Sequence, residues 1–318
     1  MVDIAAGGEN KKYSIKPRKR HIPESKMRNI EAFLYVLPWI IGFLAFQIYP
    51  FLSSFYYSLT DYTAQQAPNF IGFENYINIF TRDAIFYQSL FVTLKYVFIV
   101  VPAKLGFALF IAMILNLRLK GINWLRTVYY LPSILGGSVG IALLWRFLFN
   151  ANGAVNHFLV GVLGLPRIDW IANTSFALGT VGLLAVWQFG SSMVLFLAAL
   201  KQVPASLYEA ALIDGSGPVR NFFQITIPMI SPIILFNLIM QLIVAFQEFS
   251  APFLITSGGP LRSTYLYSLM IYENAFTYLK MGYSSALSWI LFIIVFLFTL
   301  IIFKTSSGKV YYEDGEGK

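Results

Sequence analysis

Long, uninterrupted apolar stretches constrain the fold of this chain more than any other feature. Six blocks stand out, at about 30–52, 89–115, 124–149, 175–200, 227–254 and 285–303. A bilayer core about 30 Å thick needs roughly 20 helical residues to cross, whereas a membrane strand needs about ten alternating ones. With 57% hydrophobic and only 12% charged residues, the 318-residue chain is predicted to be an all-α, polytopic membrane protein with six transmembrane helices.

The blocks divide the chain into segments. We expect a basic cytoplasmic tail at 1–29, a first transmembrane helix at 30–58 and an outer loop at 59–88. A five-helix core would follow at 89–304, with a cytoplasmic loop at 201–226 and a short cytoplasmic tail at 305–318. No internal repeat is evident, so the inverted-repeat architecture of many secondary transporters gains no support.

Positive charge is distributed unevenly, and this predicts orientation. With cytoplasmic termini, sixteen Lys and Arg residues fall on the inner side, and only Arg82, Arg167, Arg262 and Lys280 fall outside. Basic residues accumulate on the cytoplasmic side of membrane proteins. Both termini are therefore expected in the cytoplasm of a multi-pass protein of the cell inner membrane. Eight of the sixteen lie in the tail, where retention and lipid attraction explain them better than nucleic-acid binding.

Several catalytic chemistries lack their residues. The chain has no cysteine, and its two histidines, His21 and His157, lie in the tail and in an outer loop. No segment matches the phosphate-binding pattern Gly-x-x-x-x-Gly-Lys-[Ser/Thr]. We therefore expect no cofactor or metal in this chain, and we expect ATP to be hydrolysed on another polypeptide.

The loop at 201–226 has the composition of a compact docking element. The run from Glu209 through Ala210, Ala211 and Asp214 to Gly215 suggests a short helix with a glycine turn, and Pro218 suits the first turn of a second helix. Its alanines would permit close approach by a partner. Glu209 is placed to meet a basic group, and Asp214 is expected to cap the second helix.

This loop resembles the signature of permease subunits in binding-protein-dependent ATP-binding-cassette importers. The resemblance extends through Val203 to Tyr208 before the glutamate, and through Asn221-Phe222-Phe223 and Ile225-Thr226-Ile227-Pro228 after it. Further segments look like the carbohydrate-uptake branch of that family: Asn75-Tyr76, Thr93-Leu94-Lys95-Tyr96 and Thr256-Ser257-Gly258-Gly259-Pro260.

The resemblance implies partners and a substrate class. A long basic amino terminus makes the chain similar to the first of two permease types in maltose- and glycerol-phosphate-like systems. A second permease subunit, two ATP-binding subunits that hold ATP and Mg, an extracytoplasmic solute-binding protein and a carbohydrate substrate are then implied. The carboxylate of Gln247-Glu248 departs from the neutral residues expected in the fifth span.

Polar residues inside the spans suggest a substrate path, because such groups are costly in lipid. Lys95, Lys104 and Arg146 lie there, although Arg146 is near enough to the outer surface to snorkel. By resemblance, the fourth and fifth spans supply sugar contacts, and Trp187 and Phe246 are expected to stack on a sugar face. The proposed path comprises Trp187, Gln188, Ser191, Gln241, Phe246, Gln247 and Glu248.

Gln241 and Glu248 are seven residues apart, so a continuous helix would place them on one face. Two other classes of function remain open: a membrane-embedded enzyme acting on lipid-linked or carbohydrate substrates, and a channel or secondary transporter. The enzyme would call for clustered carboxylates or metal ligands, whereas the histidines lie only in the tail and in an outer loop. The channel or secondary transporter would not explain the loop at 201–226. The sequence favours the transmembrane subunit of an ATP-driven importer that translocates a sugar or oligosaccharide.

Overall fold

The computed structural model describes residues 24–117 and 121–306, which are helical apart from connecting loops and two isolated β-bridges. The expected tail residues 1–23 and 307–318 lie outside the described residues, as do Arg118 and Lys120. Within the described ranges, four helices are long and apolar enough to cross a membrane, or six spans result if each of two bent helix pairs crosses once. The all-α, polytopic class is confirmed.

The chain divides into two compact units, residues 1–53 and 54–318. The first contains α1 (Glu24–Phe43), the π-helical turn η1 (Leu44–Ile48) and the start of α2 (Tyr49–Ser58). The residues that flank η1 keep right-handed helical angles, so the helix continues through it. The segment of 28 residues from Glu31 to Ser58 contains an 18-residue stretch with a mean hydropathy of 1.8, which suits a membrane span.

The second unit is built around one long helix, α4 (Ala84–Asn116), which packs mainly against α8 (Thr174–Trp187), α9 (Gly190–Gln202) and α13 (Ser231–Phe246). Asp83 begins α4, because its carboxylate accepts hydrogen bonds from the backbone nitrogens of Ile85 and Phe86. A separate amphipathic helix, α3 (Glu74–Arg82), lies before it in the segment expected as outer loop.

The third and fourth spans are bent rather than continuous. The third consists of α5 (Ile122–Leu135) and α6 (Val139–Leu148), which meet at 102°. The fourth consists of α8 (Thr174–Trp187) and α9 (Gly190–Gln202), which meet at 47°. The first bend follows Pro132 and two glycines, and the Ser138 hydroxyl accepts from Ile141 N to start α6. Glycine and a new cap thus end one helix and begin another.

The fifth span is also interrupted. It begins with α12 (Ile227–Met229), continues as α13 (Ser231–Phe246) and resumes as α14 (Ser250–Ile255). Residues 247–249 between α13 and α14 are not helical. The prediction of one continuous helix over 227–254 is therefore wrong. At this break within the span, backbone groups can bind to neighbouring side chains.

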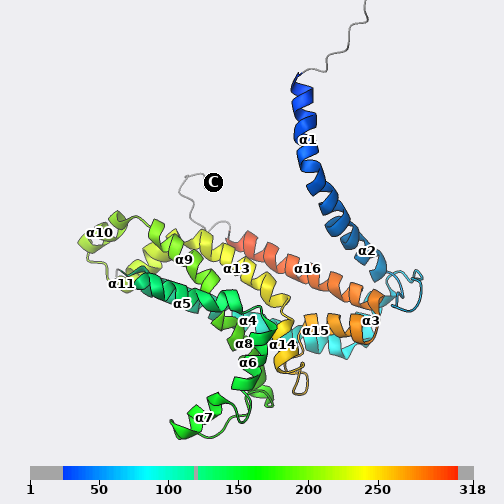
Figure 1. Ribbon diagram of the computed structural model, residues 1–318. Helices are drawn as coiled ribbons and strands as arrows, with labels where there is room; N and C mark the ends of the chain where they lie inside the picture. Colours follow the sequence, from blue (N-terminus) through cyan, green and yellow to red (C-terminus); the bar gives the residue numbers. More distant parts are fainter. Residues whose placement is uncertain (1–23, 118–120, 307–318) are drawn as a thin grey trace, which may run out of the picture. The chain divides into compact units, whose positions relative to one another are not determined.

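The remaining elements mark opposite ends of the second unit (Figure 1). Helices α10 (Ala205–Ile213) and α11 (Pro218–Asn221) lie at one end, while α14, α15 (Tyr267–Tyr272) and α3 lie at the other. Since α10 and α11 belong to the loop expected on the cytoplasmic side, the α15 end corresponds to the expected outer side. The bounds of the elements not yet given are α7 (Ala154–Gly161), α10 (Ala205–Ile213), α11 (Pro218–Asn221), η2 (Phe222–Thr226), α15 (Tyr267–Tyr272), η3 (Glu273–Thr277) and α16 (Met281–Ser306).

Candidate coupling loop and translocation site

The loop at 201–226 folds as two short helices joined by a glycine turn. Helix α10 ends where Gly215 adopts a left-handed φ of +73° and Ser216 N donates to Ala211 O at 2.8 Å. This is the hydrogen bond that closes a helix terminated by glycine. Pro218 occupies the first turn of α11, as the sequence predicts.

The outer surface of this loop combines charge with exposed apolar side chains. No residue of α10 is buried, and Glu209, Ala210 and the neighbouring backbone face solvent. Leu212 is 74% exposed and Ile213 is 87% exposed. Apolar side chains this open at the tip of a structured loop mark an interaction surface. Glu209 was predicted from the sequence as part of this surface, whereas its apolar neighbours Leu212 and Ile213 were not.

The expected role of Asp214 is wrong. Helix α11 begins at Pro218, so Gly217 occupies the N-cap position, and no side chain caps this helix. Asp214 instead directly follows α10 as its C-cap residue, where its backbone nitrogen donates to Ala210 O at 3.1 Å. Its carboxylate is exposed at the end of the docking helix.

Helix α10 is fastened to the start of the fifth span. The hydroxyls of Tyr208 and Thr226 share a hydrogen bond of 2.8 Å, and Thr226 is buried. Arg220 Nε of α11 also donates to Gln224 Oε1 of η2 (Phe222–Thr226) at 2.8 Å. Helix α10 is therefore connected to η2 through a polar contact as well as through the connecting chain.

A small cavity of about 40 Å³ lies among α4, α8 and α13, and it collects several polar groups of the expected substrate path. Gln188, Gln241 and Glu248 line it together with Lys104, which is only 9% exposed. Charged and amide side chains gathered inside apolar helices are costly to bury and are typical of functional positions. The structure brings these four residues together.

Glu248 has a structural role that the sequence analysis did not predict. Helix α13 ends at Phe246, so Gln241 and Glu248 do not share one continuous helix face. The Glu248 Oε1 atom accepts a hydrogen bond from Ala251 N at 3.0 Å, which supports the start of α14. The carboxylate thus satisfies a backbone donor at the break while the residue still lines the cavity.

The two aromatic residues expected to stack on a sugar are engaged elsewhere. Phe246 is 1% exposed and packs against Phe298 of α16, with ring centroids 5.4 Å apart. Trp187 is half-buried, and its ring lies 5.8 Å from that of Trp145. Phe246 therefore does not offer a free ring face in this structure. Ser191 and Gln247 are exposed and do not line the cavity.

The remaining intramembrane cations lie apart from this cavity. Lys95 is exposed and lines a separate cavity of about 250 Å³ with Gly179 and Gly182 of α8. Arg146 donates through Nη1 to Leu254 O at 3.3 Å, which links α6 to α14. Arg146 thus contacts a backbone acceptor in addition to lying near the expected outer surface.

Comparison with known proteins identifies relatives along most of the chain. It is 49% identical over 290 residues to the "Probable ABC transporter permease protein YesP" of Bacillus subtilis (strain 168), covering 91% of this chain and 94% of that protein. It is 33% identical over 287 residues to the "sn-glycerol-3-phosphate transport system permease protein UgpA" of Escherichia coli O6:K15:H31 (strain 536), covering 88% and 95%.

The fold also has a solved counterpart. A chain of a bacterial alginate ABC transporter, crystallised with its alginate pentasaccharide-bound periplasmic protein, aligns with a TM-score of 0.74 at 22% identity, covering 89% of this chain and 96% of that one. Residues 85–306 match the family described as "Binding-protein-dependent transport system inner membrane component". The resemblance of the 201–226 loop is thereby confirmed, and this chain is a member of the binding-protein-dependent transport system inner membrane component family.

Proposed function

We propose that this chain is the transmembrane subunit of an ATP-driven importer for a sugar or oligosaccharide, delivered by an extracytoplasmic binding protein. The permease family and the coupling loop support this function. ATP and Mg would be held by two separate ATP-binding subunits, and a second permease would complete the passage. This chain would contribute the path and the mechanical connection, with no cofactor of its own.

The observation that carries the proposal is the exposed apolar tip of α10. Leu212 and Ile213 are 74% and 87% exposed at the end of a helix in the loop expected on the cytoplasmic side, and Glu209 supplies charge on the same helix. Burying two such side chains contributes roughly 1.5–3 kcal/mol each. A cleft in an ATP-binding subunit with a basic group near its rim would match this surface.

Coupling would be mechanical. Movement of the ATP-binding subunits would displace α10, and the Tyr208–Thr226 hydrogen bond would pass this displacement to the fifth span. The fifth span carries Gln241 and Glu248 at the cavity near Lys104. Two discrete helix arrangements would then alternate access to the path, as in other transporters that rock rigid elements. This proposal requires the loop to be cytoplasmic, in agreement with the charge distribution.

The substrate class follows from the path and from relatives. The cavity offers amides and charges to a hydroxylated solute, and the UgpA relative is named for sn-glycerol-3-phosphate transport. We assign Gln188, Gln241 and Glu248 to the substrate path with Lys104. Trp187, Ser191, Phe246 and Gln247 would contribute after a rearrangement of the helix breaks, since none of these four lines the cavity in this structure.

Co-purification with matched variants tests the proposal. The tagged chain, expressed with its neighbouring genes, is expected to retain an ATP-binding subunit and a second permease. Ile213→Asp should lose the ATP-binding subunit, whereas Leu261→Asp, at an equally exposed residue of the opposite end, should keep it. A functional assembly without any ATP-binding subunit, or equal retention by both variants, would contradict the docking role.

A further inference from the structure

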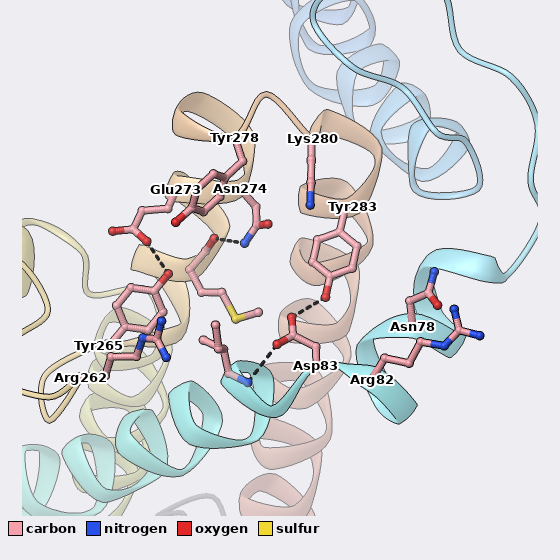
Figure 2. Close-up of a pocket in the computed structure, with 12 residues that line it drawn as sticks. Asn78, Arg82, Asp83, Arg262, Tyr265, Glu273, Asn274, Tyr278, Lys280 and Tyr283 are labelled. Carbon is pink, nitrogen blue, oxygen red and sulfur yellow. Dashed lines mark hydrogen bonds between the residues drawn. The ribbon is translucent and has the colours of Figure 1, made fainter.

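A polar cavity of about 570 Å³ lies at the end of the second unit opposite the coupling loop (Figure 2). It is separate from the cavity at Lys104. Its walls come from α3, the start of α4, the loop before α15, η3 and the start of α16. The lining residues are Asn78, Arg82, Asp83, Ile85, Arg262, Tyr265, Met270, Glu273, Asn274, Tyr278, Lys280 and Tyr283.

The two carboxylates of this cavity are already engaged. Asp83 caps α4 and accepts a hydrogen bond from the Tyr283 hydroxyl, and Glu273 accepts one from the Tyr265 hydroxyl at 2.6 Å. Figure 2 shows both pairs at the cavity wall. Burial raises the pKa of Tyr265, and the hydrogen bond to Glu273 raises it further, so this hydroxyl remains a donor.

The positive charges of this cavity lack carboxylate partners among the described residues. Within the described residues, neither Arg82, Arg262 nor Lys280 forms an ion pair with a carboxylate. The guanidinium carbon of Arg262 lies 6.0 Å from the centre of the Tyr265 ring. The three cations outnumber the two carboxylates, Asp83 and Glu273, so the lining has a net charge of +1, and none of the cations is paired with a carboxylate in the described ranges. This asymmetry favours an anionic ligand.

Strained backbone positions two of these cations. Arg262 itself has a φ of +59°, and Leu279, directly before Lys280, has a φ of +56°. Residues with side chains rarely adopt this conformation, and such strain gathers at ligand sites. The hydrogen bond from Lys280 N to Asn274 O, at 2.8 Å, holds the second of these turns. The unfavourable backbone conformations thus lie at the residues that bring Arg262 and Lys280 to the cavity.

The size and remaining lining favour a saccharide over a small ion. Ligand pockets are commonly about 300–1,000 Å³, and this volume exceeds what a lone inorganic anion fills. Phenol rings of Tyr265, Tyr278 and Tyr283 and the amides of Asn78 and Asn274 surround the charges. Aromatic faces suit sugar rings, and amides suit hydroxyls. The Asn274 Nδ2 atom donates to Met270 O at 2.9 Å, which fixes the orientation of that amide.

We propose that this outer cavity binds a saccharide that carries a carboxylate. The positive charges of Arg262 and Lys280, on different walls of the cavity, attract the carboxylate, and the tyrosine and asparagine side chains lie around the sugar ring. The inference rests on the proposed function as an importer subunit and narrows its substrate class to anionic sugars. The site would receive the solute on the outer side, ahead of the path at Lys104, Gln188 and Gln241.

A binding titration of the full-length chain in lipid nanodiscs tests the site without requiring transport. Sodium D-glucuronate and D-glucose, which differ by one carboxylate, are compared by calorimetry at constant ionic strength. Glucuronate is expected to bind at least about tenfold more tightly, which corresponds to about 1.4 kcal/mol, because hydrogen bonds to charged groups are stronger than those between neutral groups. Arg262→Gln combined with Lys280→Gln should remove this preference, whereas Arg167→Gln, at an exposed arginine outside the cavity, should keep it.

Charge-conserving variants guard against a folding defect. Arg262→Lys combined with Lys280→Arg should retain preference for glucuronate. Equal affinity for glucose and glucuronate, or an unchanged preference in the double glutamine variant, would overturn the proposal. Equal binding of sodium acetate would also overturn it, because the site would then recognise a carboxylate without a sugar. If glucuronate fails to bind while the ATP-binding subunit still co-purifies, the anionic site falls and the importer function stands.

Discussion

Gln188 and Gly136 connect the breaks of two different spans, because Gln188 Nε2 donates a hydrogen bond to Gly136 O at 3.0 Å. Ser133 strengthens the connection: its Oγ donates to Gln188 O at 3.2 Å and accepts from Ser191 N at 3.0 Å. Backbone groups freed where the α5–α6 and α8–α9 pairs bend thus satisfy one another within the protein. The two bends are therefore joined by hydrogen bonds, and this linked hinge includes Gln188 and Ser191 of the expected substrate path.

The hinge predicts a difference between adjacent glycines. A Cβ atom at Gly136 would overlap the Gln188 side chain, whereas one at Gly137 would meet no atom within 4 Å. Gly136→Ala should displace Gln188 and cost about 1–3 kcal/mol through the unsatisfied carbonyl. Thermal unfolding in detergent and uptake assays would check this. A Gly137→Ala variant that is equally impaired would show that the contact with Gln188 is not the cause.

The turn of the coupling loop supplies a second matched pair. Gly215 has a φ of +73°, whereas Gly217 has −79°, and neither position is crowded. Gly215→Ala should strain the left-handed turn by about 1–2 kcal/mol and loosen α10, while Gly217→Ala should be tolerated. The retention of the ATP-binding subunit during purification measures the effect. Equal retention by both variants would exclude a requirement for this turn geometry.

Much of the coupling loop was predictable from the sequence, because glycine and proline determine it locally. Gly215 and Pro218 behave as their backbone preferences require. The breaks in the spans were not predictable. Pro132 and the nearby glycines are tolerated in many membrane helices, and whether they bend one depends on partners such as Gln188, far along the chain.

The candidate sites show the same limit. Phe246 has the residue type expected of a sugar platform, but its burial depends on Phe298 of another helix. The outer cavity was missed entirely, because it joins residues as distant as Asp83 and Tyr283, which are 200 positions apart. No periodicity or short motif in the sequence predicts that residues so far apart lie side by side. Free charge in a cavity becomes visible only when the hydrogen-bond partners of each charge are known.

The connection between Tyr208 and Thr226 predicts a coupling defect. Tyr208→Phe removes the 2.8 Å hydrogen bond while keeping the ring, so stability should fall by about 1 kcal/mol. Uptake per ATP hydrolysed should fall by more than the small loss of folded protein explains, because α10 would move without η2. Tyr56→Phe, at an exposed tyrosine of the same unit, serves as the control. An unchanged ratio of uptake to hydrolysis in Tyr208→Phe would argue against this route.

The cavity beside Lys104 predicts that amide and acid side chains on the fifth span affect transport. Gln241→Leu should slow uptake several-fold with docking intact, because it removes a polar group from the path. Glu248→Leu should also weaken the start of α14, whereas Glu248→Gln should keep an oxygen acceptor for Ala251 N. Initial rates of labelled sugar uptake, with Gln65→Leu as an exposed control, test these effects. Wild-type uptake kinetics in both leucine variants would remove these residues from the path.

The central claim is that α10 converts ATP-driven movement into transport, and Glu209→Lys tests it most directly. The side chain is exposed on the docking helix and packs against no span, so insertion and folding should be unchanged. In proteoliposomes that contain the whole complex, binding-protein-stimulated ATP hydrolysis and uptake should both fall at least about tenfold, which corresponds to about 1.4 kcal/mol of lost coupling. Glu74→Lys, a charge reversal at an exposed glutamate of α3, should retain both activities. Normal stimulated hydrolysis and uptake in a well-inserted Glu209→Lys complex would contradict the account.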